Sequence, residues 1–227
     1  FWLKLTFPPQ QADFRNWKSV LILFITMAEE APKVKRVVEY GEPTKELVAG
    51  KLKAIIKEGG KRGVEIEGAC DMGGLSFFCT SLDIPAGDLD YLVESMKGAN
   101  NEPDPGDEER KGCSGHIGKM FFSAGDDYLA IVAYVPDEKT DAIVPQEWME
   151  HVLKMAGGTG EIIGTPNKNI CKAQIVKNGD ANMFPLKLRD PALSNSLNYL
   201  RSKKEFPEDT GDDSDECCFG DDDFPSM

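Results

Sequence analysis

Three glycines within four residues form the segment of this chain best suited to contact a ligand. Gly157, Gly158 and Gly160 follow an amphipathic helix that is predicted to begin near Pro145. Glycine has no side chain, so it adopts positive φ angles and lets a ligand approach the backbone directly. A glycine cluster after a helix also serves simply to end that helix and start a flexible loop, and both interpretations stay open.

Side chains suited to covalent or metal chemistry are few. The sequence has two histidines, and it contains no His-Glu-x-x-His, Gly-x-Ser-x-Gly or P-loop motif. Cys113 and His116 share a loop, where a thiol and an imidazole can act as nucleophile and base. Sequence neighbours rarely form such a pair, so an enzyme using these two residues is the weakest hypothesis. The six cysteines lack zinc-site spacing, and we expect no metal or other cofactor.

Hydrophobic patterns predict a mixed α/β fold around these residues. Two β-prone runs, 119–124 and 128–135, are separated by Gly125-Asp126-Asp127 and predict a hairpin. Further elements are expected from their periodicity: strands over 74–82 and 170–176, and helices over 48–56 (ended by Gly59-Gly60), 89–96, 145–155 and 191–204 (capped by Asp190). This order predicts a small mixed sheet with helices packed on it, and a core containing Phe77, Cys79, Phe122, Ile131 and Ala133.

Several motifs occur along this predicted fold in a particular order. They are Ser81-Leu82-Asp83-Ile84 leading to Leu89-Asp90-Tyr91-Leu92, the 121–124 and 129–135 strands, Glu147-Trp148 through Gly160, and Lys172-Ala173-Gln174. Their order and spacing resemble the C-terminal domain of alanyl-tRNA synthetase, which belongs to the DHH-associated domain family. The similarity covers residues 45–204.

The resemblance implies a domain that binds the outer elbow of tRNA and links aminoacylation and editing modules. It implies close approach of the glycine loop to nucleic acid. With the nearby basic residues, it gives a candidate nucleic-acid site of Gly157, Gly158, Gly160, Lys168, Lys172, Ala173, Gln174, Lys187, Arg189 and Arg201. The metal-ligand patterns of the family's editing and phosphodiesterase relatives are missing from the sequence.

This chain departs from the family pattern at the glycine loop. Glu161 interrupts the glycine run, about ten residues separate it from Ala173-Gln174, and Ile175 stands where the family has a glycine. A carboxylate at Glu161 repels phosphate at short range. Whether this loop binds RNA is therefore left open by the sequence.

The charge distribution points in two directions. A formal net charge of −13 argues against non-specific binding of nucleic acid, which depends on neutralising phosphates. However, residues 206–227 hold nine Asp or Glu and no Lys or Arg, whereas residues 150–205 hold nine Lys or Arg against five Asp or Glu. The acidic character is thus partly a property of the tail, and the basic segment is either an RNA surface or an ordinary solvated face.

Composition suggests three regions. Residues 1–43 are expected to be a leader that is disordered or not translated in normal use, 44–205 the synthetase-like domain, and 206–227 an acidic disordered tail. The apolar run at 20–25 is too short to span a bilayer, so no membrane partner is expected. Cysteines without a disulfide pattern fit the cytoplasm.

Two main functions remain. The first is a free-standing, non-catalytic module that binds tRNA, with tRNA-Ala as the expected species, or docks onto an aminoacyl-tRNA synthetase. The second is a protein-interaction scaffold that kept the fold and lost RNA binding, which the acidic tail and Glu161 favour. Salt-dependent binding of tRNA separates the two.

Overall fold

The computed structural model describes residues 38–103, 111–155, 160–179 and 182–207. Their elements are α2 (Ala49–Gly73), β1 (Phe77–Ser81), α3 (Leu89–Ala99), β2 (Gly118–Ala124), β3 (Tyr128–Tyr134), the 3-10 helix η1 (Asp137–Lys139), α4 (Pro145–Met155), β4 (Gly160–Ile162), β5 (Ile170–Val176) and α5 (Pro185–Ser202). The strands form one sheet in the order β1-β2-β3-β5-β4, in which β1 is parallel to β2 and the other neighbours are antiparallel. The predicted mixed α/β fold is confirmed.

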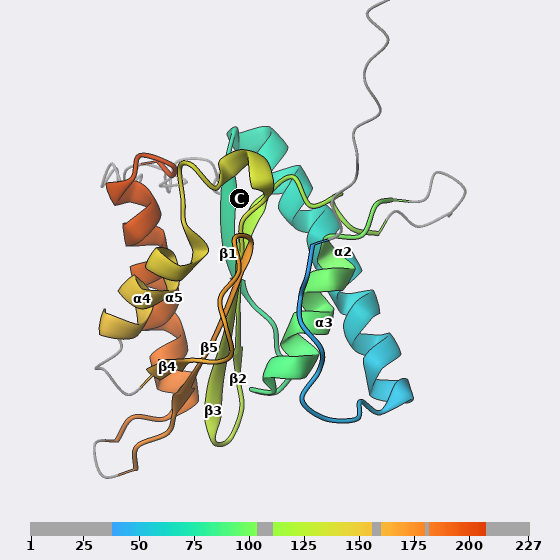
Figure 1. Cartoon of the computed structure of the whole chain (residues 1–227), viewed down its shortest axis with the longest axis vertical. Coiled ribbons are helices and arrows are strands. Elements are labelled where there is room, and N and C mark those ends of the chain that lie inside the picture. Colours follow the sequence, from blue (N-terminus) through green and yellow to red (C-terminus); the bar gives the residue numbers. More distant parts are fainter. Residues whose placement is uncertain (1–37, 104–110, 156–159, 180–181, 208–227) are drawn as a thin grey trace, which may run out of the picture. The chain divides into compact units, whose positions relative to one another are not determined.

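The sheet lies between two layers of helices. Figure 1 shows α4 and α5 on one face and α3 on the other, with α2 on the outer side of α3. Strand β3 is at the centre, and all of its residues after Tyr128 are buried because helices cover both faces. Each face has its own apolar cluster: Trp148 packs edge-on against Phe77 on the α4–α5 side, whereas Leu92 and Met96 of α3 belong to the cluster on the other side.

Four of the five predicted core residues are completely buried: Phe77, Phe122, Ile131 and Ala133. The prediction for Cys79 was partly wrong, because Cys79 belongs to the edge strand β1 and is only partly buried. Its thiol nevertheless faces the α5 side, where Sγ lies 3.0 Å from Oγ of Ser196. Burial of the thiol raises its pKa to about 12.

The predicted end of the first helix at Gly59-Gly60 was wrong. Helix α2 continues through both glycines to Gly73 and ends at Gly74, which has φ +64°. The internal glycines serve close packing instead, because a Cβ on Gly59 would lie 2.1 Å from the carbonyl oxygen of Ser95 in α3. A Cβ on Gly63 would similarly lie 2.6 Å from the carbonyl oxygen of Ala99.

The predicted start of the last helix was also wrong. Helix α5 begins at Pro185, which takes the first helical position, and Phe184 is the N-cap residue. Pro191 therefore lies inside the helix, and Asp190 does not cap it. Sequence analysis also missed the short edge strand β4, whose Gly160 had been interpreted as loop.

The boundaries of the folded region extend beyond 44–205. Residues 38–43 had been assigned to the leader, yet Val38 and Tyr40 pack against the cluster beneath α3. At the other end, Phe206 packs against the opposite cluster. The remaining predicted leader and tail lie outside the described residues. In the part of the chain that the structure describes, no helix has the length and apolar character needed to cross a membrane.

The role of the α2 glycines can be tested by adding single methyl groups. Gly59→Ala places a methyl against the α3 backbone and should lower the free energy of unfolding by about 1–3 kcal/mol. Gly68→Ala is the matched control in the same helix, because nothing lies within 4 Å of the added Cβ, and it should raise stability by about 0.5–1 kcal/mol. Urea denaturation measures both, and equal effects would contradict the packing role.

Candidate binding surface on strand β5

Strand alternation divides the Lys172-Ala173-Gln174 motif between the two faces of the sheet. Ala173 pairs with Ile131 and is completely buried in the cluster beneath α4 and α5. Lys172 and Gln174 extend from the opposite face, on the α3 side, and both are half-buried. Glu161 pairs with Gln174 across the β4–β5 ladder and is exposed. The two polar residues of the motif therefore share one face with this carboxylate.

Gln174 opens into a hollow of about 350 Å³, which we call the Gln174 hollow. Its walls come from the segment before α2, the loop that leads into α3, and the sheet. They comprise Thr44, Lys45, Ala86, Gly87, Asp88, Leu89, Asp90, Tyr128, Ile163 and Gln174. The volume is within the usual range for a small-molecule site, and the lining combines polar and apolar groups.

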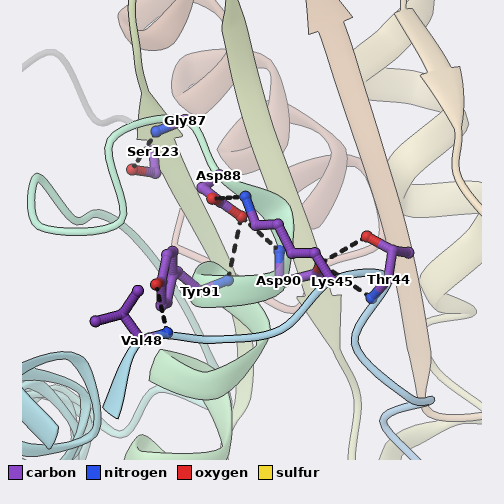
Figure 2. Close-up of polar contacts among 8 residues, drawn as sticks. All are labelled: Thr44, Lys45, Val48, Gly87, Asp88, Asp90, Tyr91 and Ser123. Carbon is purple, nitrogen blue, oxygen red and sulfur yellow. Dashed lines mark hydrogen bonds and ion pairs between the residues drawn. The ribbon is translucent and has the colours of Figure 1, made fainter. Parts of the chain in front are cut away.

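Two carboxylates at the start of α3 hold the wall formed by residues 44–48 (Figure 2). Asp90 accepts hydrogen bonds from the backbone N–H of Thr44 at 3.0 Å and from its hydroxyl at 2.6 Å. Asp88 caps the N-terminus of α3 through Oδ1, and its Oδ2 pairs with the Lys45 ammonium. The Tyr91 hydroxyl accepts a bond from the Val48 N–H at 3.1 Å. The carboxylates are therefore largely occupied within the protein.

The opposite wall depends on two glycines in contact. Gly87 has φ +76°, and a Cβ there would lie 2.5 Å from the carbonyl oxygen of Tyr128. A Cβ on Gly125 would lie 2.2 Å from the carbonyl oxygen of Ala86. This close approach lets the Gly87 N–H donate to the Ser123 hydroxyl at 3.2 Å, which fixes the loop onto the β2–β3 turn (Figure 2).

Lys172 lies beside the segment before α2. Its ammonium donates to the carbonyl oxygen of Tyr40 at 3.4 Å. Gly41 has φ +79°, and a Cβ on it would lie 3.2 Å from Nζ of Lys172. The lysine thus has a weak structural bond, and no described carboxylate forms an ion pair with it.

The structure does not gather the basic residues of the predicted site on one surface with Gly160, the one glycine of that site among the described residues. Gly160 pairs with Ile175 at one end of β5, whereas Lys168 precedes the other end, roughly 17 Å away along the strand. Lys168 forms an ion pair with Asp137 at 3.4 Å. Arg201 is in the last turn of α5, in the helix layer on the far side of the sheet from Lys172. Proximity in the sequence was a poor guide to proximity in space here, because these consecutive segments lie at different ends and on different faces of the sheet.

The other predicted site residues have local roles. A Cβ on Gly160 would lie 2.4 Å from Cδ2 of Leu153, so this glycine permits packing of α4. Lys187 donates to the side chain of Asn182, and Arg189 pairs with Asp190 at 2.8 Å. Gly157 and Gly158 lie outside the described residues.

Comparison with known proteins adds no family to this geometry. No model of a known protein family matches the chain, and no curated protein matches its sequence. The surface on β5 is therefore interpreted from its own residues.

The Cys113–His116 pair is not assembled for catalysis. Cys113 is completely buried, and its thiol donates to the carbonyl oxygen of Ala99 at 3.2 Å, whereas His116 is exposed. Among the described residues, no three His, Cys, Asp or Glu side chains are grouped to hold a metal ion.

The buried polar group near Cys113 is Lys119, which the sequence analysis did not identify. Its ammonium has no exposed surface and donates to Oδ1 of Asn100 at 2.5 Å and to the carbonyl oxygen of Ile117 at 2.9 Å. The Nδ2 of Asn100 in turn donates to the Tyr40 hydroxyl at 2.8 Å. This network joins β2, the end of α3 and the segment before α2, so its evident role is structural.

The hydrogen bonds from Thr44 to Asp90 are expected to hold the segment before α2 in place. Asp90→Ala removes the carboxylate oxygen that accepts both Thr44 hydrogen bonds and should cost about 1–2 kcal/mol of unfolding free energy, with faster amide exchange over 38–48. Glu46→Ala, an exposed residue of the same segment, is the control and should change neither. Unaltered exchange in Asp90→Ala would contradict the anchoring role.

The burial of Lys119 leads us to expect that the stability of the fold depends on pH. Burial lowers the pKa of Lys119, so the folded state binds fewer protons there than the unfolded state. Stability contributed by Lys119 should therefore rise as pH increases from the lowered pKa towards the ordinary value of about 10.4. Lys119→Met removes this contribution, so the difference in unfolding free energy between wild type and Lys119→Met should grow in favour of wild type with rising pH. Parallel pH curves would contradict the prediction.

Proposed function

We propose that this chain is a non-catalytic module that binds tRNA, with tRNA-Ala as the expected species, or docks onto an aminoacyl-tRNA synthetase. The observation that carries the proposal is the division of the Lys172-Ala173-Gln174 motif. Ala173 is used in the core, whereas Lys172 and Gln174 are displayed together beside an open hollow. The mixed α/β order of helices and strands, along which the resembling motifs occur, supports it further.

The RNA-contacting surface in this proposal is the β5 face and not the whole basic segment. Lys172 supplies a cation for a phosphate, and Gln174 supplies amide groups that can donate and accept hydrogen bonds. Exchange of the weak Tyr40 bond for a phosphate contact would let Lys172 bind without disturbing an ion pair. The four described cysteines are free thiols, and we propose the cytoplasm as the location because it is reducing.

The scaffold function stays a second candidate because many cations are already used within the protein. Lys168, Lys177, Arg189 and Lys203 each form an ion pair with a carboxylate. Such pairing reduces the positive charge available to phosphates and suits a surface that meets another protein.

A titration of the full chain with tRNA at increasing salt tests the proposal. Lys172→Gln should weaken binding and reduce the slope of log K against log salt by about 1, as expected for one lost phosphate contact. Lys61→Gln changes an exposed lysine on α2 outside the Gln174 hollow; it is the matched control and should bind as wild type does. Absence of salt-dependent tRNA binding by the wild type would favour the scaffold.

Removing negative charge should act in the opposite direction. Glu161→Gln neutralises the carboxylate that pairs with Gln174, and deletion of 208–227 removes nine carboxylates. Each change should tighten tRNA binding, most clearly at low salt, because like charges near phosphates are repulsive. Val176→Thr, an exposed neutral change on the neighbouring strand β5, is the control for Glu161→Gln. Unchanged affinity in both variants would contradict binding at the β5 face.

A further inference from the structure

One carboxylate oxygen in the Gln174 hollow is not used by the protein itself. Asp90 lines the hollow and has 8% of its surface exposed. Its Oδ2 accepts both hydrogen bonds from Thr44, which are drawn in Figure 2. No described group donates to Oδ1, and Oδ1 is not among the fully buried side-chain atoms without a partner. This oxygen is therefore reached from the open space of the hollow.

The charged side chains around this oxygen leave an excess of negative charge. Among the described residues, the lining holds two carboxylates, those of Asp88 and Asp90, and one ammonium group, that of Lys45. Lys45 forms its ion pair with Oδ2 of Asp88 and not with Asp90. Glu161 is exposed on the neighbouring strand opposite Gln174, which adds a further carboxylate near the hollow. A cationic ligand would balance this charge.

The cation on the same face of β5 does not neutralise Asp90. Lys172 lies two residues from Gln174 along the strand, but it is not part of the lining of the hollow. Its ammonium is directed to the carbonyl oxygen of Tyr40. The charge inside the hollow is therefore determined by Asp88, Asp90 and Lys45.

The rest of the lining suits a ligand with an apolar body. Ala86, Leu89, Ile163 and the ring of Tyr128 contribute apolar surface, and the amide of Gln174 contributes one polar group. Apolar walls with a few polar groups that fix orientation are typical of small-molecule sites. The face of an aromatic ring such as that of Tyr128 also attracts cations.

The single open oxygen of Asp90 restricts the kind of cation. A guanidinium group binds a carboxylate best through two parallel bonds to both oxygens, but Oδ2 is already occupied by Thr44. A Ca²⁺ ion requires six or more oxygen ligands, and among the described residues no three His, Cys, Asp or Glu side chains are grouped to hold a metal. An ammonium group needs only one charged acceptor in addition to neutral ones.

We propose that the Gln174 hollow binds a small aliphatic primary amine, with Oδ1 of Asp90 as the acceptor of its ammonium group. The alkyl part of the amine lies against Leu89, Ile163 and the Tyr128 ring. This activity goes beyond tRNA binding, in which the phosphate contact comes from Lys172 outside the lining.

A titration of the isotopically labelled full chain with butylammonium, followed by amide chemical shifts, tests the proposal. Salt of about 0.15 M limits diffuse attraction to the acidic protein to within a Debye length of about 8 Å. The shift changes should be saturable and should centre on Gly87, Asp90 and Gln174. The neutral compound 1-butanol, which has nearly the same shape, should bind at least about tenfold more weakly because it lacks the charge. This comparison uses the wild type alone and needs no variant.

Asp90→Asn separates ligand binding from the structural role of Asp90. The asparagine carbonyl oxygen can still accept from Thr44, whereas its NH₂ group replaces the open oxygen and is only a donor. Butylammonium binding should fall by about tenfold or more. Unchanged amide exchange over 38–48 would verify that the wall is retained. Asp71→Asn, the same charge change at an exposed position near the end of α2 outside the lining, is the control and should bind as wild type does.

Four results would overturn the proposal: no saturable shift changes in the wild type, equal binding of 1-butanol, an equal loss of binding in Asp71→Asn, or shift changes centred outside the hollow. The probe contains no phosphate and the titration no RNA. The result is therefore independent of whether the β5 face binds tRNA.

Discussion

The arrangement of the α2–α3 side of this protein depends on direct contact between two helix backbones. Gly59, Gly63 and Gly98 lie at this contact, and a Cβ on any of them would come within 2.1–2.6 Å of a carbonyl oxygen of the facing helix. Glycine in a helix costs about 1 kcal/mol relative to alanine, so three glycines here must be offset by the packing that they permit. The contact brings Lys53 and Lys57 close to the end of α3. A hollow of about 330 Å³ lies at this contact, lined by Ile56 and Gly60 of α2 and by Gly98 of α3.

The same side of the sheet is held together by buried polar bonds. Lys119 extends from β2 to Asn100 at the end of α3, and Asn100 bonds Tyr40 in the segment before α2. Asp90 holds the same segment through Thr44. A buried ammonium is costly to desolvate, and its bonds to carbonyl and amide oxygens offset part of that cost. Because these bonds are directional, they determine where the segment crosses α3, and thereby form one wall of the Gln174 hollow.

The fold could be predicted from the sequence wherever local periodicity decides the structure. The hairpin around Gly125-Asp126-Asp127, the helix from Pro145 and the strand over 170–176 all have strong patterns, and the structure has each of them. The glycines of α2 were misinterpreted because a helix stop and a close helix contact use the same residue type. The two roles differ in whether another helix lies against the glycines. The sequence pattern does not show where α3 packs, so it cannot separate them.

The candidate sites were harder to predict for the same physical reason. Lys172 and Ala173 are adjacent in sequence, but alternation sends one to the open face and the other to the core. Lys53 and Lys111 are far apart in sequence, and the bond between Gly112 and Gly60 brings them to one hollow. A count of charges along the sequence therefore found the basic segment after α4. It missed the cations that the fold brings together from separate segments.

The net charge of −13 gives this local grouping its significance. A negatively charged protein repels polyanions over distances up to the Debye length of about 8–10 Å at ordinary salt, so diffuse attraction to phosphate is weak. A site that binds anions must then supply positive charge at short range, where Coulomb energies are largest. The Gln174 hollow itself does not supply such charge, because Asp88 and Asp90 line it and Lys45 is already paired. On electrostatic grounds, Lys172 beside the Gln174 hollow must therefore act on a phosphate through a single local contact.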